Sequence, residues 1–359
     1  MKLTEIPVAG YEKVMRCEDA DSNLKAYISI HDTTLGPALG GVRMWPYLSE
    51  QHAFIDVNRL ARGMTYKSAV AGLRLGGGKA VLIGDAQTDK SVPLFRALGR
   101  FIDALDGLYI VAEDVGTTVE DLCIVRRETP FVGGLPQEQG SSGNPSPFTA
   151  LGVFLGMRAC LERQFGTDDF TDIRVAVQGC GNVARFLCKH LYEAGARLTV
   201  CDPVASRAQQ MQQQYGATLV APEAIYDVDC DMYAPCALGG TLNDQTLPRL
   251  RCQIVAGSAN NQCLHEAHGD QLWQRGILYA PDFVINAGGV INIAVEFEPE
   301  GYDPERALTR VQSIYETLHE VFDTADRKGT TTHQAALNLA EARLAAGRQR
   351  KKNVSTNGW

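Results

Sequence analysis

Two lysines and an aspartate stand in surroundings that suit acid–base chemistry. Lys67 and Lys79 lie among small and apolar residues, and Lys79 follows three glycines that would let a substrate backbone come close. An ammonium group held in an apolar crevice beside a second cation loses hydration, which lowers its pKa and lets the amine act as a base. Asp114 ends a predicted strand and is a candidate acid–base group. Residue types alone favour a plainer interpretation, in which the lysines extend to solvent and the aspartate caps a helix.

A glycine-rich turn follows a predicted strand at residues 174–178. Gly179, Gly181 and Ala184 form the pattern G-x-G-x-x-A, and an amphipathic helix follows it. The first glycine permits a tight turn, the second lets the backbone approach a pyrophosphate, and the alanine lets helix and strand pack closely. The other residues of this candidate cofactor turn are Cys180, Asn182 and Val183.

Asp202 ends the next predicted strand, 23 residues after Gly179. A carboxylate at this position accepts a hydrogen bond from a ribose 2′-hydroxyl and repels a 2′-phosphate. The sequence therefore favours NAD over NADP as cofactor. Arg207 is the nearby cation that could weaken this preference.

Two further segments, 234–240 and 256–261, fall at the carboxyl ends of predicted strands. In an open α/β sheet these ends face the ligand crevice, and small residues there let a cofactor come close. Asn261 could hydrogen-bond the nicotinamide amide or the substrate. Ordinary turns at the edge of a sheet are the alternative interpretation. The candidate cofactor contacts in these segments are Cys236, Ala237, Ala259 and Asn261.

Periodicity predicts the elements that must position these residues. In the first part of the chain, apolar spacing predicts helices at 50–66 and 91–105. Strands are predicted at 24–32, 80–83 and 108–112. Residues 129–147 are rich in glycine, proline and serine, which indicates a loop or hinge.

Regular alternation of strands and helices follows the hinge, and it predicts a parallel sheet with helices on both faces. The strands are predicted at 174–178, 197–201, 217–220, 230–233, 253–256 and 277–279, and long amphipathic helices at 303–327 and 331–346. We therefore expect an α/β fold with two domains. Residues 1–140, completed by C-terminal helices at about 328–359, form a substrate domain, and residues 147–327 form a Rossmann-type, doubly wound NAD domain.

The composition limits the class of protein. The chain has 359 residues and a net charge of -8, which argues against a nucleic-acid partner because phosphate binding needs a basic face. No apolar stretch reaches the roughly 20 residues of a membrane span, and the N-terminus lacks an apolar signal core. Ten scattered cysteines form no CxxC pair, so we expect reduced thiols, no metal site and a cytoplasmic protein.

Six ordered segments resemble the glutamate/leucine/phenylalanine/valine dehydrogenase family. Within this family the chain is most similar to the leucine dehydrogenase branch, from about residue 24 to 346. The segments are 32–45, 62–67, 75–79, 112–118, 143–147 and 281–292.

The resemblance implies roles in an oxidative deamination. Lys79 corresponds to the catalytic lysine that activates the water attacking the imine, and Asp114 to the acid that exchanges protons with the amino group. Lys67 corresponds to the lysine that holds the substrate carboxylate, and Thr149 and Asn261 lie around the nicotinamide and the substrate. Gly41 and Met64 are also expected to contact the substrate. Closure of a cleft between the domains would exclude water.

The resemblance also implies a pocket for the substrate side chain, formed by Leu39, Ala112, Val290 and Ile293. A glutamate enzyme of this family carries a lysine where Leu39 stands, and burying a carboxylate without one is costly. Val290 and Ile293 suggest a compact aliphatic pocket, so we expect leucine, isoleucine and valine to react. One methylene is worth about 1–3 kcal/mol of discrimination. The segment 295–300 departs from the family pattern and could shift Ile293.

Other functions remain open at this stage. An aromatic amino-acid dehydrogenase for phenylalanine or tryptophan is the first alternative, and a catalytically silent NAD-binding paralogue is a remote one. A 2-hydroxy-acid dehydrogenase would normally offer a His–Asp or Arg–His pair, and no histidine here stands in a comparable motif. The resemblance implies a homo-oligomer, with an octamer as one candidate form.

Overall fold

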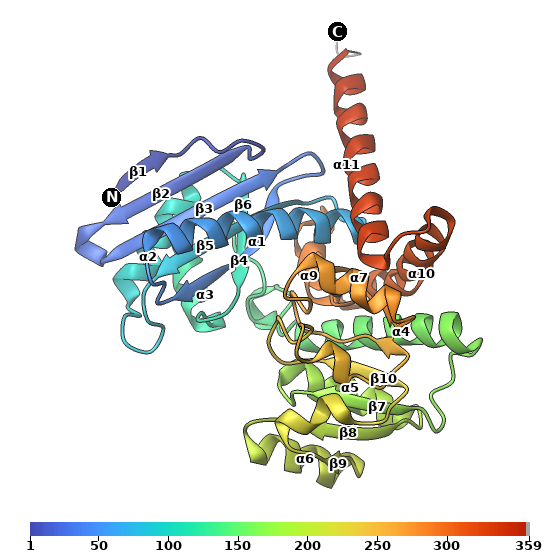
Figure 1. The fold of residues 1–359 in the computed structure, drawn as a ribbon. Coiled ribbons are helices and arrows are strands. Elements are labelled where there is room, and N and C mark those ends of the chain that lie inside the picture. Colours follow the sequence, from blue (N-terminus) through green and yellow to red (C-terminus); the bar gives the residue numbers. More distant parts are fainter. Residues whose placement is uncertain (357–359) are drawn as a thin grey trace. The chain divides into compact units, whose positions relative to one another are not determined.

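The structure is a computed structural model that describes the backbone of residues 1–356 and the side chains of residues 1–353. The chain packs as two units (Figure 1). Unit 1 comprises residues 1–144, 293–303 and the chain from 340 onward, and unit 2 comprises residues 145–292 and 304–339. Within the described residues, no helix is both long and apolar enough to cross a membrane.

Unit 1 is built on a mixed sheet of six strands in the order β1-β2-β3-β5-β4-β6. Strand β4 runs parallel to both β5 and β6, whereas β1, β2 and β3 continue the sheet in antiparallel fashion. The strands are β1 (Lys2–Glu5), β2 (Lys13–Asp19), β3 (Leu24–Asp32), β4 (Ala38–Trp45), β5 (Gly76–Ile83) and β6 (Tyr109–Glu113). The helices are α1 (Glu50–Val70), α2 (Val92–Asp103) and α3 (Val119–Val125).

Helix α1 covers one face of this sheet (Figure 1). It begins at Ser49, whose side chain accepts a hydrogen bond from the His52 N–H and so caps the helix. It lies so close to β5 that a Cβ on Gly77 would come within 2.0 Å of the Thr65 backbone nitrogen. The opposite face packs on α2 and α3 around the fully buried Phe95 and Phe101. Residues of β4, β5 and β6 that point toward α1 therefore form a separate layer.

Unit 2 contains an all-parallel sheet in the order β12-β11-β10-β7-β8-β9. The chain proceeds outward from β7 through β8 to β9 and then returns to β10 on the other side of β7. This reversal is the topological switch point of a doubly wound sheet. The strands are β7 (Arg174–Gln178), β8 (Arg197–Cys201), β9 (Thr218–Leu219), β10 (Met232–Pro235), β11 (Ile254–Val255) and β12 (Leu278–Tyr279). The helices wholly within unit 2 are α4 (Ser146–Phe165), α5 (Asn182–Glu193), α6 (Ala205–Tyr215), α7 (Glu266–Gln274), α8 (Asp282–Ile285) and α10 (Pro304–Lys328).

The two-domain α/β fold is confirmed, and β3, β7 and β8 have the bounds that the sequence predicts. The prediction missed β4 because glycines and an X-Pro step weaken the strand pattern in the segment 32–45. It also missed β1, β2 and α4. All ten cysteines are free thiols.

The unit boundaries differ from the expected ones in two segments. Residues 293–303 belong to unit 1, because the Glu296 carboxylate accepts hydrogen bonds from Gly134, Ser141 and Ser142. Residues 328–339 belong to unit 2, because the Thr332 hydroxyl at the start of α11 donates to the Tyr279 carbonyl oxygen. Helices α9 (Gly288–Ala294) and α11 (Thr332–Thr356) thus contribute residues to both units.

Candidate active site

Lys79 and Asp114 form an ion pair in unit 1. The Nζ atom of Lys79 in β5 lies 2.8 Å from Oδ2 of Asp114, which follows β6. Lys79 is 5% exposed. Burial by itself would raise the pKa of Asp114, but the nearby charges of Lys79 and Arg43 outweigh burial and lower this pKa to about 2. The lysine therefore does not stand alone in an apolar crevice, as its sequence context suggests, but faces a carboxylate.

The register of three parallel strands brings these residues together. Gly41 pairs with Ala112, and Leu39 pairs with Ile110 on one side and Gly77 on the other. Since side chains alternate between faces, Leu39, Lys79, Ala112 and Asp114 all belong to the layer beneath α1. Leu39 and Ala112 are buried there. This layer is thus apolar at one end and charged at the other.

Glycines in β4 allow the close approach that this layer needs. A Cβ on Gly41 would lie 2.7 Å from the Cβ of Asp114, and one on Gly40 would lie 1.8 Å from the Gly78 carbonyl oxygen. Any larger residue at either position would force the strands or the Asp114 side chain to move. Gly41 therefore lies next to Asp114 and leaves the space that the Lys79–Asp114 pair occupies.

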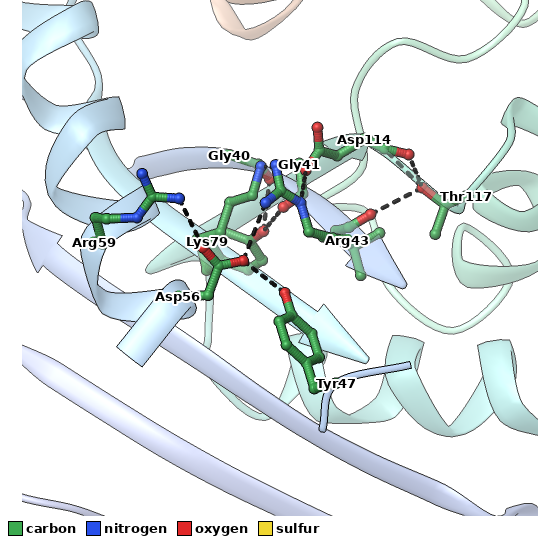
Figure 2. Close-up of polar contacts among 11 residues, drawn as sticks. Gly40, Gly41, Arg43, Tyr47, Asp56, Arg59, Lys79, Asp114 and Thr117 are labelled. Carbon is green, nitrogen blue, oxygen red and sulfur yellow. Dashed lines mark hydrogen bonds and ion pairs between the residues drawn. The ribbon is translucent and has the colours of Figure 1, made fainter. Parts of the chain in front are cut away.

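Sequence reasoning missed a second set of charged residues, which surrounds this pair (Figure 2). The Arg43 Nε donates to Asp114 Oδ2 over 3.1 Å, and its Nη1 donates to Asp56 Oδ2 over 3.0 Å. Arg43 follows Gly41 by two residues and so shares its face, which is the only signal that the sequence contained. Asp56 lies in the second turn of α1.

The remaining predicted substrate residues have different locations. Lys67 and Met64 are half-buried in the last two turns of α1. Ile293 is half-buried in unit 1, where a Cβ on Gly133 would lie 2.8 Å from its Cγ2. Val290 is half-buried on the same helix, α9, but is part of unit 2.

In unit 2 the glycine turn joins β7 to α5 at the switch point. Gly179 has a φ of +93°, a left-handed conformation that favours glycine, and its Cβ would lie 2.9 Å from that of Ala237. Gly181 caps α5 and borders open space, since a Cβ there would meet nothing within 4 Å. Ala184 is buried against the sheet, whereas Asn182 is exposed and Val183 is half-buried.

Asp202 at the end of β8 fixes this turn. Its Oδ2 accepts from the Cys180 N–H over 2.8 Å, and its Oδ1 accepts from the Val204 N–H over 2.8 Å. A carboxylate has about four lone-pair sites, so Asp202 keeps acceptor capacity for a ribose hydroxyl. The open space at Gly181, the N-terminus of a twelve-residue helix and this carboxylate fit a dinucleotide.

The other candidate cofactor contacts lie at neighbouring strand ends or on α4. The Cys236 N–H donates to the Gln178 carbonyl oxygen over 2.8 Å, and the Ala259 N–H donates to that of Pro235 over 2.9 Å. Asn261 is exposed and has a φ of +51°, which is rare outside glycine. Thr149 in α4 is half-buried, and a Cβ on Gly289 would lie 2.6 Å from its hydroxyl oxygen.

These features define a class. A doubly wound parallel sheet with a glycine turn at its switch point is a dinucleotide-binding fold, and here the chain also contains a second sheet in which the buried Lys79 pairs with Asp114. Comparison with known families agrees. Residues 11–131 match the Glu/Leu/Phe/Val dehydrogenase dimerisation domain, and residues 140–206 and 204–351 match Glutamate/Leucine/Phenylalanine/Valine dehydrogenase.

Similar proteins agree over nearly the whole chain. A leucine dehydrogenase of Bacillus cereus is 55% identical over 348 residues, which is 97% of this chain and 94% of that protein. An L-tryptophan dehydrogenase of Nostoc punctiforme is 46% identical over 96% of both chains. The crystal structure of L-tryptophan dehydrogenase from Nostoc punctiforme superposes with a TM-score of 0.82 at 45% identity, covering 94% of this chain and 97% of that one.

The chain belongs to the glutamate/leucine/phenylalanine/valine dehydrogenase family. It is therefore an amino-acid dehydrogenase that depends on NAD, and the sequence-based expectation of its family, fold and cofactor is confirmed.

Proposed function

We propose that the protein catalyses the reversible oxidative deamination of a branched-chain aliphatic L-amino acid. Leucine is the preferred substrate, isoleucine and valine also react, and the products are the 2-oxo acid and ammonia. The observation that carries this proposal is the Lys79–Asp114 pair beside the buried, apolar Leu39 and Ala112, in a chain 55% identical to a leucine dehydrogenase. The aromatic alternative has less support, because the L-tryptophan dehydrogenase is 46% identical.

The side chains of unit 1 divide the acid–base work. Lys67 binds the substrate carboxylate, with Gly41 and Met64 beside it. Asp114 accepts a proton from the substrate ammonium, which frees the nitrogen lone pair for imine formation. NAD, held by the residues of unit 2, would supply the acceptor for the hydride that leaves the substrate Cα. Lys79 then takes a proton from the water that attacks the imine carbon, and the resulting carbinolamine loses ammonia. The net reaction consumes one water and releases one proton together with the ammonium ion.

Residues of unit 2 are assigned to the cofactor. The turn from Gly179 to Ala184 binds the pyrophosphate at the N-terminus of α5, and Asp202 binds the adenosine ribose. Cys236, Ala237 and Ala259 would contact the cofactor at the strand ends, and Thr149 and Asn261 would contact its nicotinamide. Unit 1 is thus the substrate domain and unit 2 the NAD domain.

The apolar pocket excludes glutamate. Leu39 is 1% exposed and Ala112 is 5% exposed, so neither position offers a partner for a γ-carboxylate. A buried carboxylate without hydrogen bonds or a counter-charge is strongly unfavourable. Ile293 of unit 1 would limit the length of the pocket, which favours four-carbon aliphatic side chains over aromatic rings.

The test measures NADH formation at alkaline pH with leucine, isoleucine, valine, phenylalanine, tryptophan and glutamate. Lys79→Ala is compared with Lys90→Ala, a control that removes another lysine of unit 1, whose Nζ lies 2.5 Å from Asp121 Oδ2. We expect aliphatic turnover that Lys79→Ala abolishes and Lys90→Ala retains. A preference for an aromatic substrate would discard the pocket assignment, and full activity of Lys79→Ala would discard the mechanism.

We also propose that the enzyme acts as a homo-oligomer, in octameric form, in the cytoplasm. The match of residues 11–131 to a dimerisation domain supports self-association, and ten free thiols suit a reducing compartment. Native mass spectrometry of the purified protein tests the octamer, because any other predominant mass would contradict it.

A further inference from the structure

Arg43 links two carboxylates that come from different elements of unit 1. Its guanidinium donates through Nε to Asp114 and through Nη1 to Asp56 (Figure 2). The guanidinium is planar and its donors are fixed relative to one another, so two bonds to different partners define its orientation. The Arg43 side chain is 22% exposed, which limits the solvent screening of both ion pairs.

Asp56 is itself held on both oxygens. The Tyr47 hydroxyl donates to Oδ2 over 2.7 Å, and Arg59 Nη2 donates to Oδ1 over 2.9 Å. Burial would raise the pKa of Asp56, but hydrogen bonds from Tyr47 and Arg59 and the charge of Arg43 lower it overall. Asp56 is therefore a permanent anion at a fixed place on α1, which makes it a suitable anchor for Arg43.

The two cations on Asp114 differ in what they can do. Lys79 and Arg43 both contact the same carboxylate atom, Oδ2, over 2.8 Å and 3.1 Å. The lysine must give up and regain a proton during the proposed reaction, so its contact with Asp114 changes in the cycle. The arginine cannot lose its proton at any working pH. Only Arg43 can hold the carboxylate through every step.

We propose that Arg43 is the positioning residue that keeps the Asp114 carboxyl group oriented while Asp114 and Lys79 exchange protons, and that Asp56 anchors Arg43 for this purpose. The inference rests on the proposed function, which assigns the proton transfers to Lys79 and Asp114. Arg43 acts through Asp114 and is not assigned a contact with the substrate. The titratable and charged groups around Asp114 are Lys79 of β5, Arg43 of β4, Tyr109 and Glu113 of β6, Tyr47 after β4, and Asp56 and Arg59 of α1.

The experiment separates charge from orientation with two substitutions. Arg43→Met removes both, whereas Arg43→Lys keeps the charge but cannot reach Asp114 and Asp56 with the same planar fork. For Arg43→Met we expect kcat to fall by about 100-fold, as for a misplaced reacting group, with KM for leucine changed by less than about threefold. The loss of unfolding free energy between pH 4 and pH 2 should become smaller, because the pKa of Asp114 rises toward its unfolded value when a cation is lost.

The conservative substitution Arg43→Lys should affect orientation without affecting charge. Arg43→Lys should keep the pH dependence of the unfolding free energy close to that of the wild type but still lower kcat, because the charge remains and the fixed orientation is lost. Asp56→Asn should lower kcat in the same way, since Arg43 then loses its charged anchor. A purely structural role for Arg43 would lower the stability of all variants without changing how the unfolding free energy depends on pH.

A matched control comes from β2. Arg16 bridges Glu18 and the α1 residue Glu50, with its Nη2 2.8 Å from Glu50 Oε2, and its side chain is 27% exposed. Arg16→Met therefore breaks a comparable strand-to-helix bridge away from Asp114, and we expect its kinetics to match those of the wild type. NAD affinity, measured by fluorescence, reports whether unit 2 is intact in each variant.

The outcomes are distinct. The inference is wrong if Arg43→Met folds and matches Arg16→Met both in kcat and in the pH dependence of its unfolding free energy. If Arg43→Met does not fold, unchanged kcat in Arg43→Lys and Asp56→Asn would overturn it equally. Full activity of Lys79→Ala would instead overturn the proposed function, whatever the Arg43 variants do.

Discussion

The Cβ of Asp114 lies directly over Gly41, so close that a methyl group on Gly41 would be 2.7 Å from it. The same methyl group would lie 2.7 Å from the Glu113 carbonyl oxygen, which is backbone and cannot turn away. The absence of a side chain on β4 is therefore part of the site, since it lets the aspartate after β6 reach the lysine on β5.

The first prediction concerns this contact. Gly41→Ala should lower the free energy of unfolding by about 1–3 kcal/mol, as overpacking does, and should lower kcat because Asp114 must shift. The control is Gly63→Ala in α1, where a Cβ meets nothing within 4 Å and the substitution should stabilise the helix by about 0.5–1 kcal/mol. Urea unfolding and leucine turnover are measured for both. Wild-type kcat in Gly41→Ala would show that the contact with Gly41 does not fix the position of Asp114.

The second prediction concerns pH and stability. The pKa of Asp114 is about 2 in the folded protein and 3.8 in its ordinary range, so the unfolded chain binds the proton more tightly. The ion pair then contributes stability above about pH 4, and this contribution is lost as the pH falls toward 2. Asp114→Asn should be destabilised at pH 7, where it leaves the buried Lys79 without its counter-charge. The gap to the wild type in unfolding free energy should narrow between pH 4 and pH 2, and a constant gap would contradict the assignment.

The third prediction concerns the choice of cofactor. Asp202→Asn keeps an oxygen acceptor for the Cys180 N–H but removes the negative charge that repels a 2′-phosphate. Such a repulsion is worth about 1–4 kcal/mol at contact distance, so the ratio of kcat/KM for NAD over NADP should fall by roughly tenfold or more. Asp172→Asn, which removes an exposed partner of Arg197, should leave this ratio unchanged. An unaltered ratio in Asp202→Asn would mean that another group selects the cofactor.

The fourth prediction concerns Glu296, whose carboxylate accepts from the Gly134 N–H, the Ser142 N–H and the Ser141 hydroxyl over 2.9, 2.9 and 2.6 Å. Glu296→Gln turns one acceptor into a donor and should destabilise unit 1 by about 1–3 kcal/mol. Because Ile293 lies one turn earlier, the preference for leucine over phenylalanine should also fall.

Glu193→Gln is the control for this substitution, since Glu193 makes an exposed surface pair with Lys189. It should change neither stability nor preference. Kinetics with both amino acids and thermal unfolding measure the two effects. A loss of stability in Glu296→Gln with an unchanged substrate preference would show that Ile293 is held by other contacts.

The glycine turn and the candidate acid–base residues could be identified because they depend on local patterns in the sequence. The turn at Gly179 and Gly181 is recognisable within a few residues, since a glycine pattern between a strand and a helix has few other uses. In β3, β7 and β8 the residues alternate between apolar and polar or form an apolar run. This pattern is clear enough to predict where each strand begins and ends. The candidate residues Lys79 and Asp114 stand out because their neighbours are small or apolar.

The tertiary structure decided which distant residues meet. The strand order β5-β4-β6 is not encoded in any single segment, yet it brings Lys79 and Asp114 together over Gly41. Arg43 is 71 residues from Asp114 in the chain, and its spacing from Gly41 indicates the face it shares but not the partner it contacts.

The unit boundary has the same origin. Segment 293–303 joins unit 1 through hydrogen bonds of Glu296 to residues more than 150 positions away. The sequence by itself thus determined the family, the cofactor turn and the candidate acid–base residues, because these depend on spacing along the chain. Only the tertiary structure decided which residues contact the Asp114 carboxylate and where the unit boundaries fall. Strand register and helix packing depend on contacts between segments far apart in sequence.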